Sequence, residues 1–80
     1  MTPRARHVMP ADLAEALRAS GTRSDYDSRP AYQRNDYVGW ITAAKSAETR
    51  SRRIAQMIEE LARGGVYMKM THAHSRKDAT

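Results

Sequence analysis

The stretch that decides the fold is DYVGWITAAKSAETRSRRI, which runs from Asp36 to Ile54. It holds the single tryptophan of the chain, Trp40, and ends in a dense cluster of arginines. Apolar residues recur through its first part every three or four positions, which is the spacing of one face of an α-helix. Ser46 stands between this pattern and the arginines, where a serine side chain favours the start of a new helix. The stretch therefore predicts two helices joined by a sharp turn.

The first of these helices is predicted to begin at Ala31 or Tyr32, just after Pro30, and to end at Lys45. Its apolar face is wide enough to contact two neighbouring elements. That face comprises Tyr37, Val38, Ile41 and Ala44, with Trp40 beside Tyr37 and Ala44.

The second helix is predicted to begin after Ser46, whose hydroxyl can accept the backbone N–H of Glu48 or Thr49. Glu48 lies in the first turn, where the helix dipole favours negative charge, and Gly64 and Gly65 end the helix. The inward face is predicted to comprise Ile54, Ala55, Ile58, Leu61 and Ala62, with Met57 at its edge. Charged pairs four residues apart, Glu48 with Arg52 and Glu59 with Arg63, are expected on the outer side.

The chain before this region predicts one further main helix and one short helix. Proline suits a first helical turn and glycine a helix end, so the first helix should begin at Pro10 and end before Gly21. Residues 22–28 predict a helix of one or two turns anchored by Tyr26. We therefore expect an all-α bundle of three main helices and one short helix over residues 9–65. Residues 1–8 are expected to form a disordered arm and residues 66–80 a mostly disordered tail, because VYMKM has no second strand to pair with.

Composition narrows the class of protein. Eighty residues suffice for one small domain, and the absence of cysteine excludes disulfides and thiolate metal sites. No apolar run approaches the ~20 residues needed to cross a bilayer, so we expect a cytoplasmic protein without a transmembrane segment. The formal charge is +5, but residues 9–65 carry nine basic and eight acidic side chains, so most of the excess lies outside them.

The strongest candidate for a binding surface is a cluster of basic side chains around the predicted turn: Lys45, Arg50, Arg52 and Arg53. Guanidinium groups bind phosphate and carboxylate in bidentate fashion, so this cluster could bind an anion or an acidic partner. The alternative is structural. Arg53 or Arg50 would pair with Asp36 or Glu48, or with free carbonyls at the end of the preceding helix, and so fix the angle of the turn.

Other side chains have a structural and a functional interpretation. Trp40 with Tyr37 could stack on nucleic-acid bases, but their helical spacing favours a place in the core. His72 and His74 have a spacing that holds a metal only if another ligand converges, and they lie in the predicted tail. The residues indicate no catalytic set, no metal site and no cofactor.

The region 10–65 resembles the YdeI/OmpD-associated family, also called bacteriocin-protection proteins. The resemblance is carried by PADLAEAL, by Tyr26 and Asp27, and above all by YVGWITAAKSAETRSRRIAQMIEELARGG. It implies a helical domain without established catalytic residues and an association with resistance to antimicrobial peptides. Arg29 departs from the family pattern, because relatives tend to have leucine there.

We therefore expect a small non-enzymatic interaction module, monomeric or weakly homo-oligomeric, that binds a protein partner not identified by the sequence. The resemblance links it to stress or antimicrobial-peptide tolerance. The alternative is a small nucleic-acid-binding protein, with the arginines of the last helix on backbone phosphates. The eight acidic residues in 9–65 count against that alternative.

Overall fold

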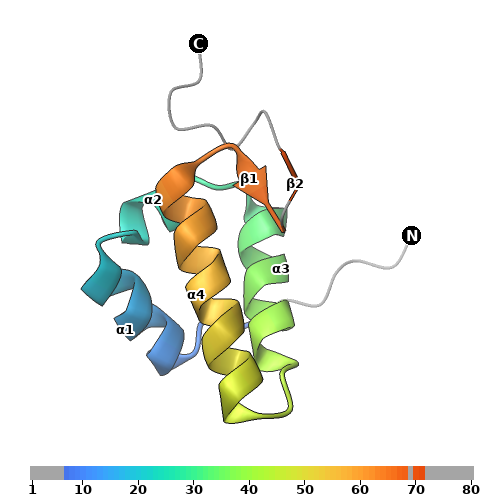
Figure 1. Ribbon diagram of the computed structural model, residues 1–80. Helices are drawn as coiled ribbons and strands as arrows, with labels where there is room; N and C mark the ends of the chain where they lie inside the picture. Colours follow the sequence, from blue (N-terminus) through green and yellow to red (C-terminus); the bar gives the residue numbers. More distant parts are fainter. Residues whose placement is uncertain (1–6, 69, 72–80) are drawn as a thin grey trace.

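The computed structural model describes residues 7–68, 70 and 71, and it confirms a compact, mostly helical fold (Figure 1). The helices are α1 (Ala11–Ser20), α2 (Arg23–Asp27), α3 (Ala31–Thr42) and α4 (Ala47–Arg63), followed by the short strands β1 (Val66–Tyr67) and β2 (Met70–Thr71). Three main helices and one short helix thus stand where the sequence predicts them.

The longest helix, α4, is the centre of the fold. It contacts α1, α2, α3 and β1, and Figure 1 shows it between α1 and α3 with the two strands across one end. Every described helix, α4 included, and β1 contribute side chains to a single core. The buried apolar side chains are Leu13, Leu17, Tyr26, Tyr37, Val38, Ile41, Met57, Leu61 and Tyr67.

Local backbone chemistry sets the limits of α1. Pro10 precedes its first residue in an extended conformation, so the helix begins one residue later than predicted. At the other end Gly21 lies in the left-handed region with φ 72°, which a residue with a side chain rarely adopts. There the N–H of Thr22 donates to Leu17 O at 3.0 Å and that of Gly21 to Arg18 O at 3.2 Å. These bonds satisfy carbonyls that the ending helix would leave free.

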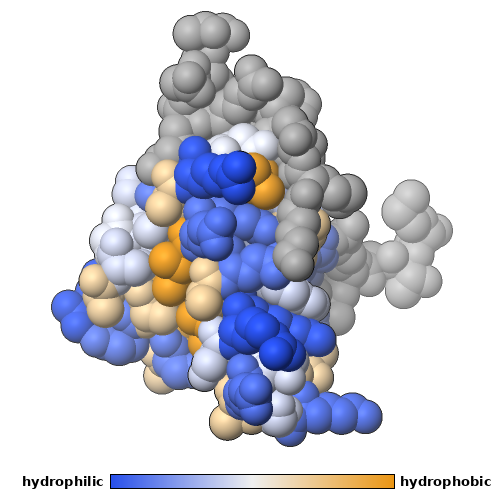
Figure 2. All heavy atoms as spheres, in the orientation of Figure 1, coloured by the Kyte–Doolittle hydropathy of each residue, from blue (hydrophilic) through white to orange (hydrophobic). Residues whose placement is uncertain are grey.

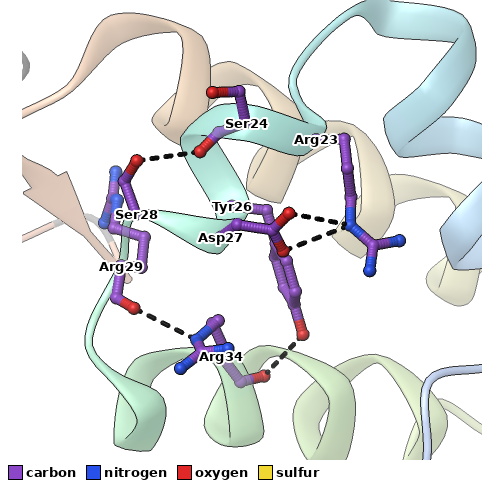
Figure 3. Close-up of polar contacts among 7 residues, drawn as sticks. All are labelled: Arg23, Ser24, Tyr26, Asp27, Ser28, Arg29 and Arg34. Carbon is purple, nitrogen blue, oxygen red and sulfur yellow. Dashed lines mark hydrogen bonds and ion pairs between the residues drawn. The ribbon is translucent and has the colours of Figure 1, made fainter.

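The short helix α2 is held from both sides by its anchor, Tyr26. The ring is buried in the core, and its hydroxyl donates to the carbonyl of Arg34 on α3 at 3.5 Å (Figure 3). Arg34 in turn donates from Nε to the carbonyl of Arg29 at 3.1 Å, across the α2–α3 connection. These contacts give the short helix the order that its length alone does not provide.

The helix α3 ends at Thr42, three residues before the predicted end at Lys45. In a continuing helix the carbonyl of Trp40 would accept the N–H of Ala44, but that N–H donates to Ile41 O at 3.2 Å instead. Arg53 Nη1 of α4 occupies the Trp40 carbonyl at 2.6 Å. A side chain from α4 therefore takes the hydrogen bond that would have extended α3, and Ala44 lies in the turn.

The start of α4 agrees with prediction, whereas its buried face is shifted. Ser46 is the N-cap, and its hydroxyl accepts the N–H of Thr49 at 3.1 Å. Met57, predicted at the edge, is fully buried, while Ala55 and Ala62, predicted inside, are exposed. The inward face is thus rotated toward Met57, Glu60 and Leu61. Ile54 and Ile58 are only half-buried beside it.

The segment after α4 forms a short hairpin, whereas the sequence indicated no second strand to pair with VYMKM. Gly64 and Gly65, with φ 74° and 73°, reverse the chain, and β1 pairs antiparallel with β2, Val66 opposite Thr71 and Tyr67 opposite Met70. The second strand that the sequence seemed to lack comes three residues after the first. Residues 72–80, the remainder of the predicted tail, lie outside the described residues.

The described part of the predicted arm lies against α3. The backbone N–H of His7 donates to Asn35 Oδ1 at 2.8 Å. A Cβ on Gly39 would stand 2.7 Å from His7 Nε2, so the imidazole rests where α3 has no side chain. Val8 is exposed and Met9 packs on the core. Residues 1–6 of the arm are outside the described residues.

Candidate functional site

The predicted cluster of four basic side chains does not remain together in the structure. Arg50 points to α1, where Nε and Nη2 donate to the two carboxylate oxygens of Asp12 at 2.8 and 2.9 Å. The hydrogen bonds from Arg50 lower the pKa of the Asp12 carboxyl, and those to Asp12 raise the pKa of Arg50. Arg50 therefore joins α4 to α1, a contact that the sequence did not indicate.

Arg53 joins α4 to α3. Besides its hydrogen bond to the Trp40 carbonyl, its guanidinium carbon lies 5.2 Å from the centre of the Trp40 ring. A cation over an indole face is attracted by the ring quadrupole. Of the structural alternatives, the contact with a carbonyl at the end of α3 is the one that forms. Asp36, a predicted partner for these arginines, instead accepts a hydrogen bond from Tyr67 Oη at 2.6 Å.

Arg52 and Arg53 converge with Trp40 on an open groove of about 520 Å³ between α3 and α4, which we call the α3–α4 groove. Arg52 is exposed and Trp40 is half-buried, and one aromatic residue and two arginines thus line the same space. Figure 2 shows hydrophilic residues over much of this face and an apolar strip on the α1 side of α4. Lys45 is exposed in the turn and does not line the groove. The lining residues are Trp40, Thr49, Arg52, Arg53, Ala55, Gln56 and Glu59.

A second polar constellation, buried at the other end of α4, was not predicted. It centres on Glu60, whose side chain is 4 % exposed. Its Oε1 accepts hydrogen bonds from the hydroxyl of Tyr37 and from the N–H of Met68 at 2.8 Å, and its Oε2 accepts one from Gln56 Nε2 at 3.0 Å. Both carboxylate oxygens are thus occupied by the protein's own donors.

Arg29 extends this network through hydrogen bonds to Gln33 and to the backbone of Glu60. It is 5 % exposed and donates from Nη1 to Gln33 Oε1 at 3.1 Å and from Nη2 to the carbonyl of Glu60 at 3.0 Å. Burial raises the pKa of Tyr37, and its hydrogen bond to Glu60 raises it further, so the hydroxyl keeps its proton. Among the described residues no buried side-chain nitrogen or oxygen lacks a hydrogen-bond partner. The network therefore has a complete set of hydrogen bonds, and it joins α3 and α4 to Arg29 in the α2–α3 connection and to Met68, which directly follows β1.

Sequence patterns contain a partial signal for this network. Gln33 lies four residues before Tyr37 on the inner face of α3, and Glu60 lies between the buried positions Met57 and Leu61. Polar residues at inward positions of a helix need hydrogen-bond partners, and two of them indicate a shared buried network. Arg29, in the connection before α3, supplies the third member.

The other candidates from the sequence are the two aromatic side chains Tyr37 and Trp40 and the histidines of the predicted tail. Tyr37 is fully buried, so it is not a stacking surface for a base, whereas Trp40 lines the groove. His72 and His74 lie outside the described residues. Within the described part of the chain no group of three histidine, cysteine, aspartate or glutamate side chains is placed to hold a metal ion.

Fold and site together define a small helical domain, built on α4, with a cationic and aromatic groove beside its α3–α4 turn. The chain belongs to the OmdA family, described as bacteriocin-protection, YdeI or OmpD-associated, whose pattern matches residues 7–64. The match takes in all four helices and stops before β1. No curated protein and no solved structure gives a significant match. None of the helices in the described residues is long and apolar enough to span a membrane.

Proposed function

We propose that the protein is a non-enzymatic binding module that recognises an acidic segment of a partner protein in the α3–α4 groove. The observation that carries the proposal is the convergence of Trp40, Arg52 and Arg53 on one open groove. Tryptophan and arginine are the residues that most often dominate binding energy at protein interfaces. The Trp40 carbonyl fixes the guanidinium of Arg53, so less side-chain freedom is lost when a carboxylate binds there.

The buried network supports a binding role over a catalytic one. Among the described residues Glu60 is the carboxylate most removed from water, yet both its oxygens accept hydrogen bonds from the protein and it does not line the groove. A general acid or base has to reach the proton that it transfers. Glu60 is placed to stabilise the fold.

The charge of the groove also bears on the link to antimicrobial-peptide tolerance, which rests on the family. Such peptides carry lysine and arginine on their polar face, and the groove, with two arginines against the one glutamate Glu59, has a net positive charge that disfavours them. We therefore assign the protein to tolerance through an acidic partner, and not through capture of the peptide itself.

Trp40 provides a direct test, because it is the only tryptophan in the chain. Its fluorescence should change on titration with a glutamate-rich decapeptide and remain unchanged with a lysine-rich one. Arg52→Ala should weaken the acidic peptide by roughly fivefold, the equivalent of about 1 kcal/mol. Arg18→Ala, which removes an exposed arginine of α1 that does not line the groove, is the matched control.

Two outcomes would overturn the proposal. The first is an acidic peptide that leaves Trp40 fluorescence unchanged at millimolar concentration, or that binds Arg52→Ala as well as the wild type. The second is tight binding of a single-stranded oligonucleotide, with affinity falling steeply as salt rises, which would establish the nucleic-acid alternative. For the biological link, a peptide-sensitive bacterium expressing the wild type should survive better than one expressing Arg52→Ala.

A further inference from the structure

Four charged residues lie on the outer side of α4 and take no part in the ion pairs described above: Glu48, Arg52, Glu59 and Arg63. All four are exposed and lie on the side of the helix opposite Met57 and Leu61. The pairs expected within the helix do not form: in the described part of the chain none of the four makes an ion pair. Arg52 makes only a long hydrogen bond, to Thr49 Oγ1 at 3.4 Å.

The order of these charges is symmetrical. Along the helix the signs are negative, positive, negative and positive, and the pattern is centred between Ala55 and Gln56. If a second α4 lay antiparallel about a two-fold axis at that point, Glu48 would face the partner's Arg63 and Arg52 would face the partner's Glu59. The symmetry repeats each contact, so all four charges of both helices would be opposite a charge of the other sign.

This pattern also selects one register. A shift of the two helices by one turn in one direction sets Glu48 opposite the partner's Glu59, and a shift in the other direction sets Arg52 opposite the partner's Arg63. A parallel arrangement sets each charge opposite its own copy. All three alternatives oppose like charges, which disfavours them.

We propose that the protein self-associates through this face, as an antiparallel α4–α4 dimer with its axis between Ala55 and Gln56. Ala55 is exposed and has a small side chain, so the helices can approach closely at the axis. The charged positions span about 22 Å along α4, at about 1.5 Å per residue. A contact made mainly of exposed ion pairs is weak and salt-sensitive, so we expect a dissociation constant on the order of 1 mM at low salt.

This proposal does not depend on the proposed function, because the dimer needs no other partner. The dimer would nevertheless affect the proposed function, because Arg52 and Glu59 also line the α3–α4 groove. The second copy would cover part of the groove, so an acidic partner and a second copy would compete.

The test is sedimentation equilibrium up to about 1 mM protein, at about 20 mM and about 500 mM sodium chloride. The wild type should show a dimer at low salt that dissociates at high salt. Arg52→Glu sets two carboxylates opposite each other at both symmetry-related positions, and Glu59→Arg sets two guanidinium groups there. Each single variant should weaken the dimer at least about tenfold.

Charge exchange gives the decisive result. The double variant Arg52→Glu/Glu59→Arg restores opposite signs and should recover the wild-type constant to within about twofold, as should an equimolar mixture of the two single variants. Lys45→Glu changes the net charge by the same amount as Arg52→Glu, but at a residue outside α4, and should leave the dimer intact. Circular dichroism establishes that each variant is folded. A monomeric wild type at the highest concentration and lowest salt overturns the proposal, as does a double variant or a mixture that stays dissociated.

Discussion

The two ends of α4 place charged side chains in opposite surroundings. Near its start, Arg50, Arg52 and Arg53 keep contact with water, and two of them reach to neighbouring helices. Near its end, Glu60 is buried with Arg29 beside it, and every oxygen of its carboxylate has a donor. A buried charge is tolerated only when its hydrogen bonds are complete, whereas an exposed charge loses little when a bond is lost. Loss of the buried carboxylate at the end of α4 should therefore cost more stability than loss of any one arginine at its start.

The largest expected effect comes from Glu60→Ala. It leaves the Tyr37 hydroxyl and the Met68 N–H without their acceptor in a buried site, so we expect a loss of about 3 kcal/mol of unfolding free energy in urea. Glu59→Ala is the matched control, because the neighbouring side chain is exposed, and it should change stability by less than ~0.5 kcal/mol. Equal effects at the two positions would show that the buried hydrogen bonds of Glu60 contribute nothing beyond what an exposed carboxylate does.

Arg53→Ala should have the next largest effect. It frees the Trp40 carbonyl and removes the cation from the indole face, so we expect a loss of about 1.5 kcal/mol, measured by thermal unfolding. Arg52→Ala removes a neighbouring arginine that makes one long hydrogen bond and should cost much less. An Arg53→Ala variant as stable as Arg52→Ala would show that the contact with Trp40 contributes nothing to the fold.

Ser46→Ala removes the side-chain acceptor of the Thr49 N–H at the start of α4. Loss of an N-cap costs about 1 kcal/mol in helices of this kind. Ser51→Ala changes the same residue type inside the helix, at an exposed position, and should be neutral or slightly stabilising. The difference between the urea midpoints of the two variants measures how much the N-cap stabilises the fold. A negligible difference would contradict the prediction that the Ser46 cap is stabilising.

The smallest expected effect is the pH dependence from Asp12. Because Arg50 lowers its pKa, the folded chain binds fewer protons at this carboxyl than the unfolded chain does around pH 4. The stabilisation is complete above the unfolded pKa, about 4, and is lost as the pH falls through the lower folded pKa. Asp12→Asn should flatten the fall of the thermal midpoint below about pH 4, while Glu59→Gln should leave that fall unchanged. If the thermal midpoint of Asp12→Asn fell with pH as steeply as that of the wild type, the Asp12–Arg50 pair would not contribute to the pH dependence of stability.

The features that the sequence predicted are those encoded by near neighbours. The N-cap at Ser46, the glycine end at Gly21 and the anchor Tyr26 depend on residues within one or two turns, so single-chain patterns contain them. The early end of α3 was missed because its cause, Arg53, lies 13 residues beyond the carbonyl that it binds.

The buried network was missed for the same reason, since Arg29 and Glu60 meet across 31 residues. Hydrophobic periodicity assigns polar residues to the outside of a helix, so it places Gln33 and Glu60 wrongly. The hairpin was missed because its strands have two residues each, too few for a period. Contacts of Tyr67 with Asp36 and of Met68 with Glu60 hold β1 in place. Of the candidate site, the sequence identified the residue types, while the division among Arg50, Arg52 and Arg53 depends on where α1 and α3 pack.

The N–H of Met68 that completes Glu60 has a consequence for synthesis on the ribosome, where the chain emerges from its N-terminus onward. All four helices precede residue 68 in the order of emergence, so Glu60 Oε1 can at first accept only from Tyr37 and lacks its second donor, the N–H of Met68. Burying Glu60 is least favourable in that interval. The last turn of α4 should therefore close late, after Met68 has left the tunnel.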